Sequence, residues 1–172
     1  MSNLSIADSI RRVTGHEVHE AWLLEARCFP SDETASKETL EYRQREAPEL
    51  FWGYFKDSRL IGLICCTQAP DKLTHESLYK HIPEGKTVCV HSVAVDQEHQ
   101  RQGIATSLLK HLLQHVQENF DQVTKVSLLC HDKLKLLYEK VGFQCRGLSE
   151  VVHGPRPWFD MEYSISHGGD RH

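Results

Sequence analysis

Apolar residues recur at intervals of three and four along the second half of the chain, which is the spacing of one buried helix face. They are Ala105, Leu108, Leu109, Leu112, Leu113 and Val116. The pattern predicts an amphipathic helix that begins after the turn at 96–103 and packs on a core.

An earlier helix has a recognisable start. Thr14 and Glu17 have the spacing of a capping box, and an amphipathic run to Phe29 follows them. The basic residues before Thr14 also resemble a kinase site, but a capping threonine already explains this position. We therefore expect Thr14 to cap a helix, and the sequence leaves its phosphorylation open.

Two more helices carry start or stop signals. The stretch Ser36–Ala47 is helical in pattern and stops at Pro48. The stretch Leu134–Val141 has Asp132 as a candidate N-cap and is closed by Gly142. The sequence thus predicts four helices.

Seven segments are rich in apolar and β-branched residues and are bounded by turn residues, as strands are. They are Ile10–Val13, Leu50–Phe55, Leu60–Thr67, Thr87–Val95, Lys125–Cys130, Gln144–Leu148 and Trp158–Ile165. Asp57-Ser58 predicts a hairpin turn between the second and third. The polar stretch Gln68–Lys86 predicts a long loop with one helical turn, and loops of this length are often functional.

The resulting order, β-α-α-β-β-β-α-β-α-β-β, predicts an α/β fold in which helices flank one mixed β-sheet. A chain of 172 residues has room for a single domain, which we place at residues 8–166. Apolar residues make up 40% and charged residues 26%, as in ordinary globular proteins.

Charge argues against some classes of partner. Twenty Lys and Arg face 24 Asp and Glu, so the net charge is −4, which disfavours nucleic acid or an anionic membrane as the main partner. Protonation of some of the 12 His would bring the chain close to neutrality near pH 6. No apolar run is long enough to span a bilayer.

The cysteines indicate a reducing compartment. Six are present, mostly inside apolar segments, and none has C-x-x-C spacing, so we expect neither a metal site nor a disulfide framework. The first residues lack the basic and apolar blocks of a secretory signal. We therefore expect a soluble, cytoplasmic protein; the sequence does not indicate its oligomeric state.

The sharpest local motif is Gln100-Arg101-Gln102-Gly103-Ile104-Ala105, between a strand and a helix. Backbone N–H groups at a helix N-terminus suit a phosphate, Gly103 and Ala105 would let it approach, and Arg101 adds charge. The motif is neither a Walker loop nor a dinucleotide fingerprint. On spacing alone, an ordinary turn remains open.

Two segments resemble the hallmarks of the GNAT superfamily of N-acetyltransferases. One is Val93-Ala94-Val95 with Gln100-x-x-Gly103-x-Ala105, and the other is Leu136 to Phe143, a helix ending in Tyr-x-x-x-Gly-Phe. The resemblance implies that the strand holds the pantetheine of acetyl-CoA and the turn its pyrophosphate. The implied acetyl-CoA residues are Val93, Ala94, Val95, Gln100, Arg101, Gln102, Gly103, Ile104, Ala105, Thr106 and Tyr138.

A narrower resemblance covers most of the chain. The segments 71–78, 90–95 and 47–50 are similar to the arylalkylamine (serotonin) N-acetyltransferases. The short ends favour the non-vertebrate, fungal type, whose relatives include polyamine acetyltransferases. The resemblance implies direct transfer of acetyl from acetyl-CoA to a small primary amine in a ternary complex.

The family's catalytic strand carries two histidines, which match Cys89 and His91 here, so only the second is kept. A base must take a proton from the ammonium group, and histidine has a suitable pKa. The resemblance assigns this role to His91. It assigns to Tyr138 the proton or hydrogen bond that the leaving thiolate needs. We interpret Cys89 as a packing residue and not as a nucleophile.

For the amine pocket, the resemblance points to Phe29, Pro30, Leu129, Trp158 and Phe159. Their rings would favour an aryl tail. Nearby acidic residues could instead attract a polyamine, although a solvated acidic surface explains them better; they are Asp32, Glu33, Glu46 and Glu49. The substrate stays open.

Two other functions remain open. A non-catalytic acyl-CoA-binding domain would bind the co-substrate without amine-dependent CoA release, and the replacement of a histidine by Cys89 is its support. Acetylation of a protein N-terminus or lysine would need an open groove. The segment 68–86 would cover such a groove if it folds over the site.

Overall fold

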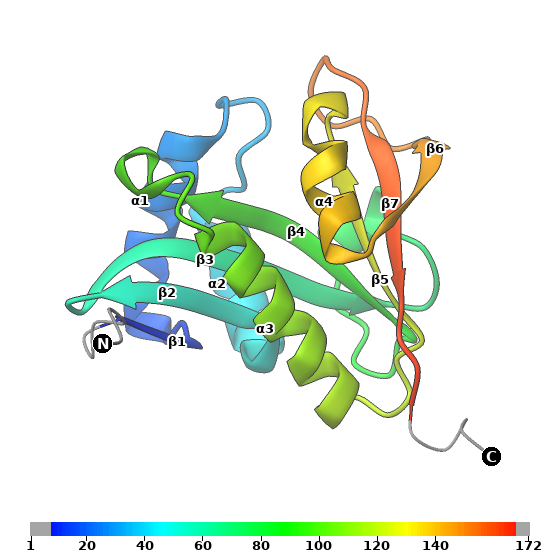
Figure 1. Cartoon of the computed structure of the whole chain (residues 1–172), viewed down its shortest axis with the longest axis horizontal. Coiled ribbons are helices and arrows are strands. Elements are labelled where there is room, and N and C mark those ends of the chain that lie inside the picture. Colours follow the sequence, from blue (N-terminus) through cyan, green and yellow to red (C-terminus); the bar gives the residue numbers. More distant parts are fainter. Residues whose placement is uncertain (1–7, 168–172) are drawn as a thin grey trace. The chain divides into compact units, whose positions relative to one another are not determined.

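The computed structural model describes residues 8–167 (Figure 1). The strands are β1 (Asp8–Arg12), β2 (Phe51–Lys56), β3 (Arg59–Ala69), β4 (Thr87–Val95), β5 (Lys125–Cys130), β6 (Gln144–Leu148) and β7 (Phe159–Ser164). The helices are α1 (Val18–Cys28), α2 (Lys37–Glu46), α3 (Ile104–Asn119) and α4 (Lys135–Val141). The predicted order of strands and helices is confirmed.

The strands form one mixed sheet in the order β1-β2-β3-β4-β5-β7-β6. β4 and β5 are parallel, whereas β1 and β2, β2 and β3, β5 and β7, and β6 and β7 are antiparallel. The predicted α/β fold with a mixed sheet is therefore confirmed. The domain bounds 8–166 stay a prediction.

The described residues fall into two compact units. The first contains residues 8–65 and Ser92–Leu109, and the second contains Cys66–His91 and residues 110–167. β3, β4 and α3 each contribute residues to both units. Within residues 8–167, no helix combines the length and apolar character that a membrane span needs.

In the first unit, α1 and α2 bury apolar side chains against strand residues. The core consists of Val13, Val18, Ala21, Leu24, Leu40, Phe51, Phe55, Leu60, Leu63, Cys65 and Ala94. Burying one large apolar side chain contributes roughly 1.5–3 kcal/mol, so this cluster is the main source of the unit's stability. The predicted hairpin is confirmed: Asp57 and Ser58 have φ of 52° and 66°, as a tight β-turn between twisted strands requires.

The helix start predicted at Thr14 is present as a 3-10 turn at Gly15–Glu17 that leads into α1. The Glu17 carboxylate accepts the backbone N–H of Thr14 at 3.0 Å and also pairs with Arg11 at 2.8 Å. Thr14 therefore lies where the capping interpretation placed it.

In the second unit, the long loop is held against the end of β3. The backbone N–H of Gln68 donates to Nδ1 of His81 at 3.0 Å, and its side chain donates to the carbonyl of Gly85 at 3.1 Å. The loop carries the predicted helical turn, at Glu76–Leu78. It begins at Pro70 and not at Gln68, because β3 continues to Ala69.

The prediction that Asp132 caps the last helix is wrong. A 3-10 turn at Asp132–Leu134 precedes α4, and His131 is its N-cap. The carboxylate of Asp132 instead pairs with Nζ of Lys135 at 3.0 Å. The closing role of Gly142 is confirmed, since its φ is 120° and its N–H donates to the carbonyls of Tyr138 and Glu139.

Candidate active site

The turn between β4 and α3 presents backbone N–H groups at a helix start. Arg101 and Gly103 have φ of 65° and 81°, so the chain turns sharply before α3. The N–H of Ser107 donates to the carbonyl of Gly103 at 2.9 Å, and the helix N–H groups ahead of such a bond have no acceptor within the helix. The space where a Cβ of Gly103 would stand is open. These features fit a phosphate group.

The strand residues before this turn are firmly held. Ala94 is buried, while Val93 and Val95 are half-buried. The carbonyl of Val95 accepts a hydrogen bond from the side chain of Gln100 at 3.2 Å and another from the thiol of Cys28 at 3.4 Å. The turn is therefore tied back to its own strand. Assignment of acetyl-CoA to residues 93–95 and 100–106 stays a prediction.

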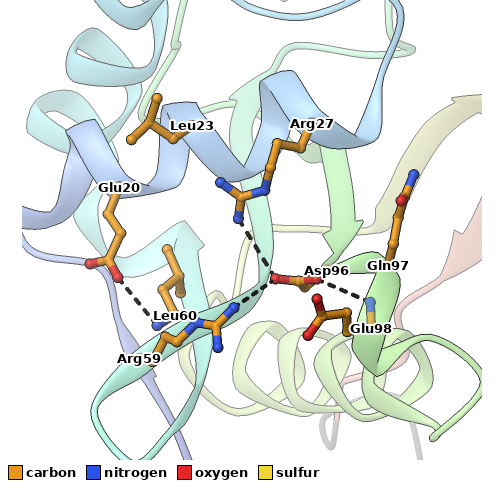
Figure 2. Close-up of a pocket in the computed structure, with 8 residues that line it drawn as sticks. All are labelled: Glu20, Leu23, Arg27, Arg59, Leu60, Asp96, Gln97 and Glu98. Carbon is orange, nitrogen blue, oxygen red and sulfur yellow. Dashed lines mark hydrogen bonds and ion pairs between the residues drawn. The ribbon is translucent and has the colours of Figure 1, made fainter.

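A cavity of about 390 Å³ lies in the first unit beside the end of β4 (Figure 2). Its lining residues are Glu20, Leu23, Arg27, Arg59, Leu60, Asp96, Gln97 and Glu98. Arg27 and Arg59 both reach the Asp96 carboxylate, at 3.7 and 3.3 Å. The cavity contains none of the predicted site residues, and both of its arginines pair with the one carboxylate of Asp96.

His91 in the second unit is held by a neighbouring strand. Its Nε2 lies 2.7 Å from Oγ1 of Thr67 on β3. Thr67 is buried, whereas His91 is half-buried. A buried hydroxyl at this distance restrains the imidazole ring, and because a hydroxyl both donates and accepts, either tautomer can make the contact. The arrangement suits a base whose proton-accepting nitrogen must point in one direction.

Cys89, two residues before His91, is fully buried. It packs in a small apolar cluster with Ala69, Leu73 and Val151, and Leu129 lies against the same cluster. These contacts support the interpretation of Cys89 as a packing residue.

Tyr138 on α4 is buried, with its ring edge-on to that of Phe143. Burial raises the pKa of the Tyr138 hydroxyl above its ordinary value, and the nearby Cys130 raises it further. The hydroxyl therefore keeps its proton throughout the physiological range, as a proton donor must.

Three predicted pocket residues lie close together in the second unit, because Leu129 and Phe159 are on paired strands and Trp158 directly precedes Phe159. Trp158 stacks on His131 with 3.9 Å between ring centroids, and its indole N–H donates to the carbonyl of His153. Nζ of Lys135 lies 4.1 Å from the ring centroid of Phe159. Both rings therefore have fixed orientations.

Phe29 and Pro30 lie in the first unit, in the connection between α1 and α2. Phe29 packs partly on the core of that unit and Pro30 is exposed. Of the nearby acidic residues, Glu33 is half-buried and three are exposed: Asp32, Glu46 and Glu49. Solvation of the exposed three favours the surface interpretation over a dedicated polyamine site.

Comparison with known proteins decides the family. The profile of the acetyltransferase (GNAT) family matches residues 18–143, which is most of the chain. This chain belongs to that family. The two hallmark segments recognised in the sequence both lie within the matched range, and the observed fold is the one they implied.

The curated relatives include serotonin N-acetyltransferases. That of Mesocricetus auratus is 34% identical and that of Macaca mulatta 30%, each over 119 residues, or 69% of this chain. The match spans only 57% and 58% of those proteins.

Solved structures show the same acetyltransferase fold. The loading GNATL domain of CurA from Lyngbya majuscula has a TM-score of 0.79 and 16% identity, covering 92% of this chain and 98% of that one. The GphF GNAT-like decarboxylase, solved in complex with isobutyryl-CoA, has a TM-score of 0.77 and 18% identity, covering 92% and 100%.

Three polar residues of the chain were missed in the sequence. Thr67 lies within the apolar strand β3, and Glu25 is a charged residue at helical spacing from buried Val18 and Ala21. A charged residue on the apolar face of a helix is unusual, so the sequence alone could have singled out Glu25. Asp160, the strand neighbour of Leu129, carries a carboxyl whose pKa is raised by burial, and nothing in its local sequence indicated this.

Proposed function

We propose that this chain is an acetyl-CoA-dependent N-acetyltransferase that acetylates a small primary amine of the arylalkylamine class. The observation that carries the proposal is the 2.7 Å contact between His91 on β4 and Thr67 on β3. β4 is the strand that leads into the helix-start turn at 100–106. It supplies an oriented base on the same strand as the acetyl-CoA motif.

The residues at the β4–α3 turn fit acetyl-CoA as the acetyl donor. The N–H groups of Ile104, Ala105 and Thr106, at the positive end of α3, would bind its pyrophosphate. The co-substrate supplies a thioester carbonyl, which is the group that an amine attacks. The strand segment 93–95 would hold the pantetheine arm by backbone hydrogen bonds.

His91 would make the amine nucleophilic. An alkylammonium titrates near the lysine pKa of about 10.4, so only about one molecule in a thousand is free amine at pH 7. The imidazole, oriented by Thr67, would accept the surplus proton directly or through water. Orientation of the amine beside the thioester would supply most of the remaining rate enhancement.

Tyr138 would donate a hydrogen bond to the leaving thiolate. Its hydroxyl retains its proton because burial raises its pKa. A neutral phenol that donates to a departing sulfur completes the transfer without a covalent acetyl-enzyme. Cys89 is not required in this scheme, in agreement with its place in an apolar cluster.

The names of the curated relatives and the aromatic residues Phe29, Trp158 and Phe159 support an arylalkylamine. A polyamine is the second candidate, and the half-buried Asp160 carboxyl beside Leu129 is the observation that favours it. Carboxyl groups attract a second ammonium, whereas rings attract an aryl tail.

The test measures CoA release from acetyl-CoA by thiol detection, with tryptamine, phenylethylamine, spermidine and a lysine peptide. We expect release with the two aryl amines and loss of turnover in His91→Gln and Tyr138→Phe, each with near-native acetyl-CoA affinity. Release with spermidine alone would replace the aryl amine by a polyamine. Silence with all four amines, while acetyl-CoA still binds, would show a binding domain without catalysis.

A further inference from the structure

Glu25 is a carboxylate buried in the first unit, with 1% of its surface exposed. Oε1 accepts the hydroxyl of Ser92 at 2.6 Å, and Oε2 accepts the backbone N–H of Ala35 at 2.8 Å. A buried charge is tolerated only when it is hydrogen-bonded, and charge-assisted bonds of this length are strong. The fold therefore keeps a costly group here for the contacts it makes.

Those contacts close both ends of one short segment, residues 29–35. At its start, the N–H of Phe29 donates to the main-chain carbonyl of Glu25 at 3.1 Å. At its end, the N–H of Ala35 donates to the side chain of the same residue. Between them, the carbonyl of Pro30 accepts the N–H groups of Glu33 and Thr34.

The other carboxylate oxygen fixes this closed segment to the central strand. Ser92 is buried on β4 and follows His91 directly in the chain. One side chain thus joins the segment that carries Phe29 and Pro30 to the strand that carries the proposed base.

We propose that Glu25 is a positioning residue for the amine: it holds the segment 29–35 in the conformation that places Phe29 and Pro30 for amine binding. This inference rests on the proposed function. Glu25 does not touch the substrate. Its effect passes through the hydrogen bonds to Ala35 and Ser92, which a neutral side chain of the same shape can also form.

A glutamine at position 25 preserves that geometry. Its carbonyl oxygen accepts the N–H of Ala35, and its NH₂ group donates to the hydroxyl of Ser92, which reverses that one bond. An alanine removes both bonds, and Ser92→Ala removes only the bond to the strand. We call the two hydrogen bonds of Glu25 to Ala35 and Ser92 the tether. Glu25→Gln keeps both bonds, Ser92→Ala loses one, and Glu25→Ala loses both.

The experiment measures KM for tryptamine and for acetyl-CoA separately in these variants, and amide hydrogen exchange over residues 29–35. We expect Glu25→Ala, which loses both hydrogen bonds, to raise the amine KM by at least about tenfold, with the acetyl-CoA KM changed less than about twofold. Ser92→Ala should lie between Glu25→Ala and the wild type. Glu25→Gln should stay close to the wild type, and exchange over 29–35 should accelerate only where the tether is lost.

Leu40→Ala is the matched control, because Leu40 is fully buried in the same core and makes no part of the tether. It lowers overall stability and should not raise one KM selectively. Equal rises in both KM values in Glu25→Ala, as in the control, would overturn the proposal, and so would a Glu25→Gln variant as impaired as Glu25→Ala.

The two proposals fail differently. If the wild-type chain releases no CoA with any amine, the proposed function fails and the positioning role fails with it. Hydrogen exchange still reports the tether in that case, because it needs no turnover. If the wild type is active and Glu25→Ala keeps its amine KM, only the positioning role is wrong.

Discussion

The contact between Thr67 and His91 shows how one hydroxyl can orient the side chain of a proposed base. A half-buried imidazole without a fixed neighbour would sample two ring flips and two tautomers. The 2.7 Å contact with a buried hydroxyl holds the ring flip that places Nε2 beside Oγ1 of Thr67, and either tautomer can make it. Since proton transfer depends steeply on geometry, the contact is expected to affect the rate more than the binding of either substrate.

The variant Thr67→Val removes this hydroxyl and keeps the branched shape of the side chain. We expect kcat to fall by about tenfold, which is the value of one hydrogen bond in the transition state, with little change in either KM. Thr67→Ser should restore most of the rate. Steady-state kinetics with an aryl amine checks this, and a fully active valine variant would show that Thr67 does not orient the base.

Cys65 gives a prediction for alkaline pH. Burial raises the pKa of its thiol from 9.0 to about 12, because the thiolate is disfavoured in the core. A raised pKa in the folded state gives stability that is present below pH 9 and lost as pH rises toward the folded pKa. The free energy of unfolding should therefore fall between pH 9 and pH 11, by up to about 1.4 kcal/mol per pH unit from this group.

Urea denaturation at pH 8 to 11 tests this, and Cys65→Ala should make the decline with pH shallower. Leu63→Ala is the control, because Leu63 is buried in the same cluster and does not titrate. It should lower the free energy of unfolding equally at every pH. Identical slopes in Cys65→Ala and the wild type would contradict the prediction.

At the scale of elements, periodicity was sufficient to predict where strands and helices lie. β4 and β5 have the bounds expected from the sequence, because their runs of Val, Leu and Cys end at polar residues on both sides. The capping residue predicted for α4 was wrong, because Asp132 pairs with Lys135 instead of capping the helix. A local pattern does not reveal which of two nearby partners a carboxylate will choose.

The candidate site was predictable only in part, for the same reason. Motif residues such as His91 and Gly103 have local signatures. The partners that orient them come from distant parts of the chain: Thr67 is 24 residues from His91, and Glu25 is 67 residues from Ser92. Such pairs are created by strand order and helix packing, which no single segment encodes.

The start of α3 offers the test of acetyl-CoA binding. Gly103 has a positive φ and open space beside it, so a valine there strains the backbone and places a branched side chain next to the helix N–H groups. We expect Gly103→Val to weaken acetyl-CoA binding by at least about tenfold. Isothermal titration measures this affinity directly. An unchanged affinity would show that the phosphate does not bind at this turn.

At the scale of the whole molecule, ligand binding and stability are linked. A ligand that binds only the folded chain stabilises it by about 2.7 kcal/mol when present at 100 times its Kd. For a protein of this length, that corresponds to a rise in Tm of roughly 5–10 °C. The Tm of the chain therefore measures acetyl-CoA binding even when no turnover occurs.

This linkage separates binding from chemistry. Thermal unfolding with saturating acetyl-CoA should show the full rise in Tm for the wild type and for His91→Gln, because the histidine acts on protons and not on the co-substrate. Gly103→Val should show a much smaller rise. A His91→Gln variant that lost both turnover and the rise in Tm would place His91 in co-substrate binding, so the catalytic role would then have to be assigned to another group.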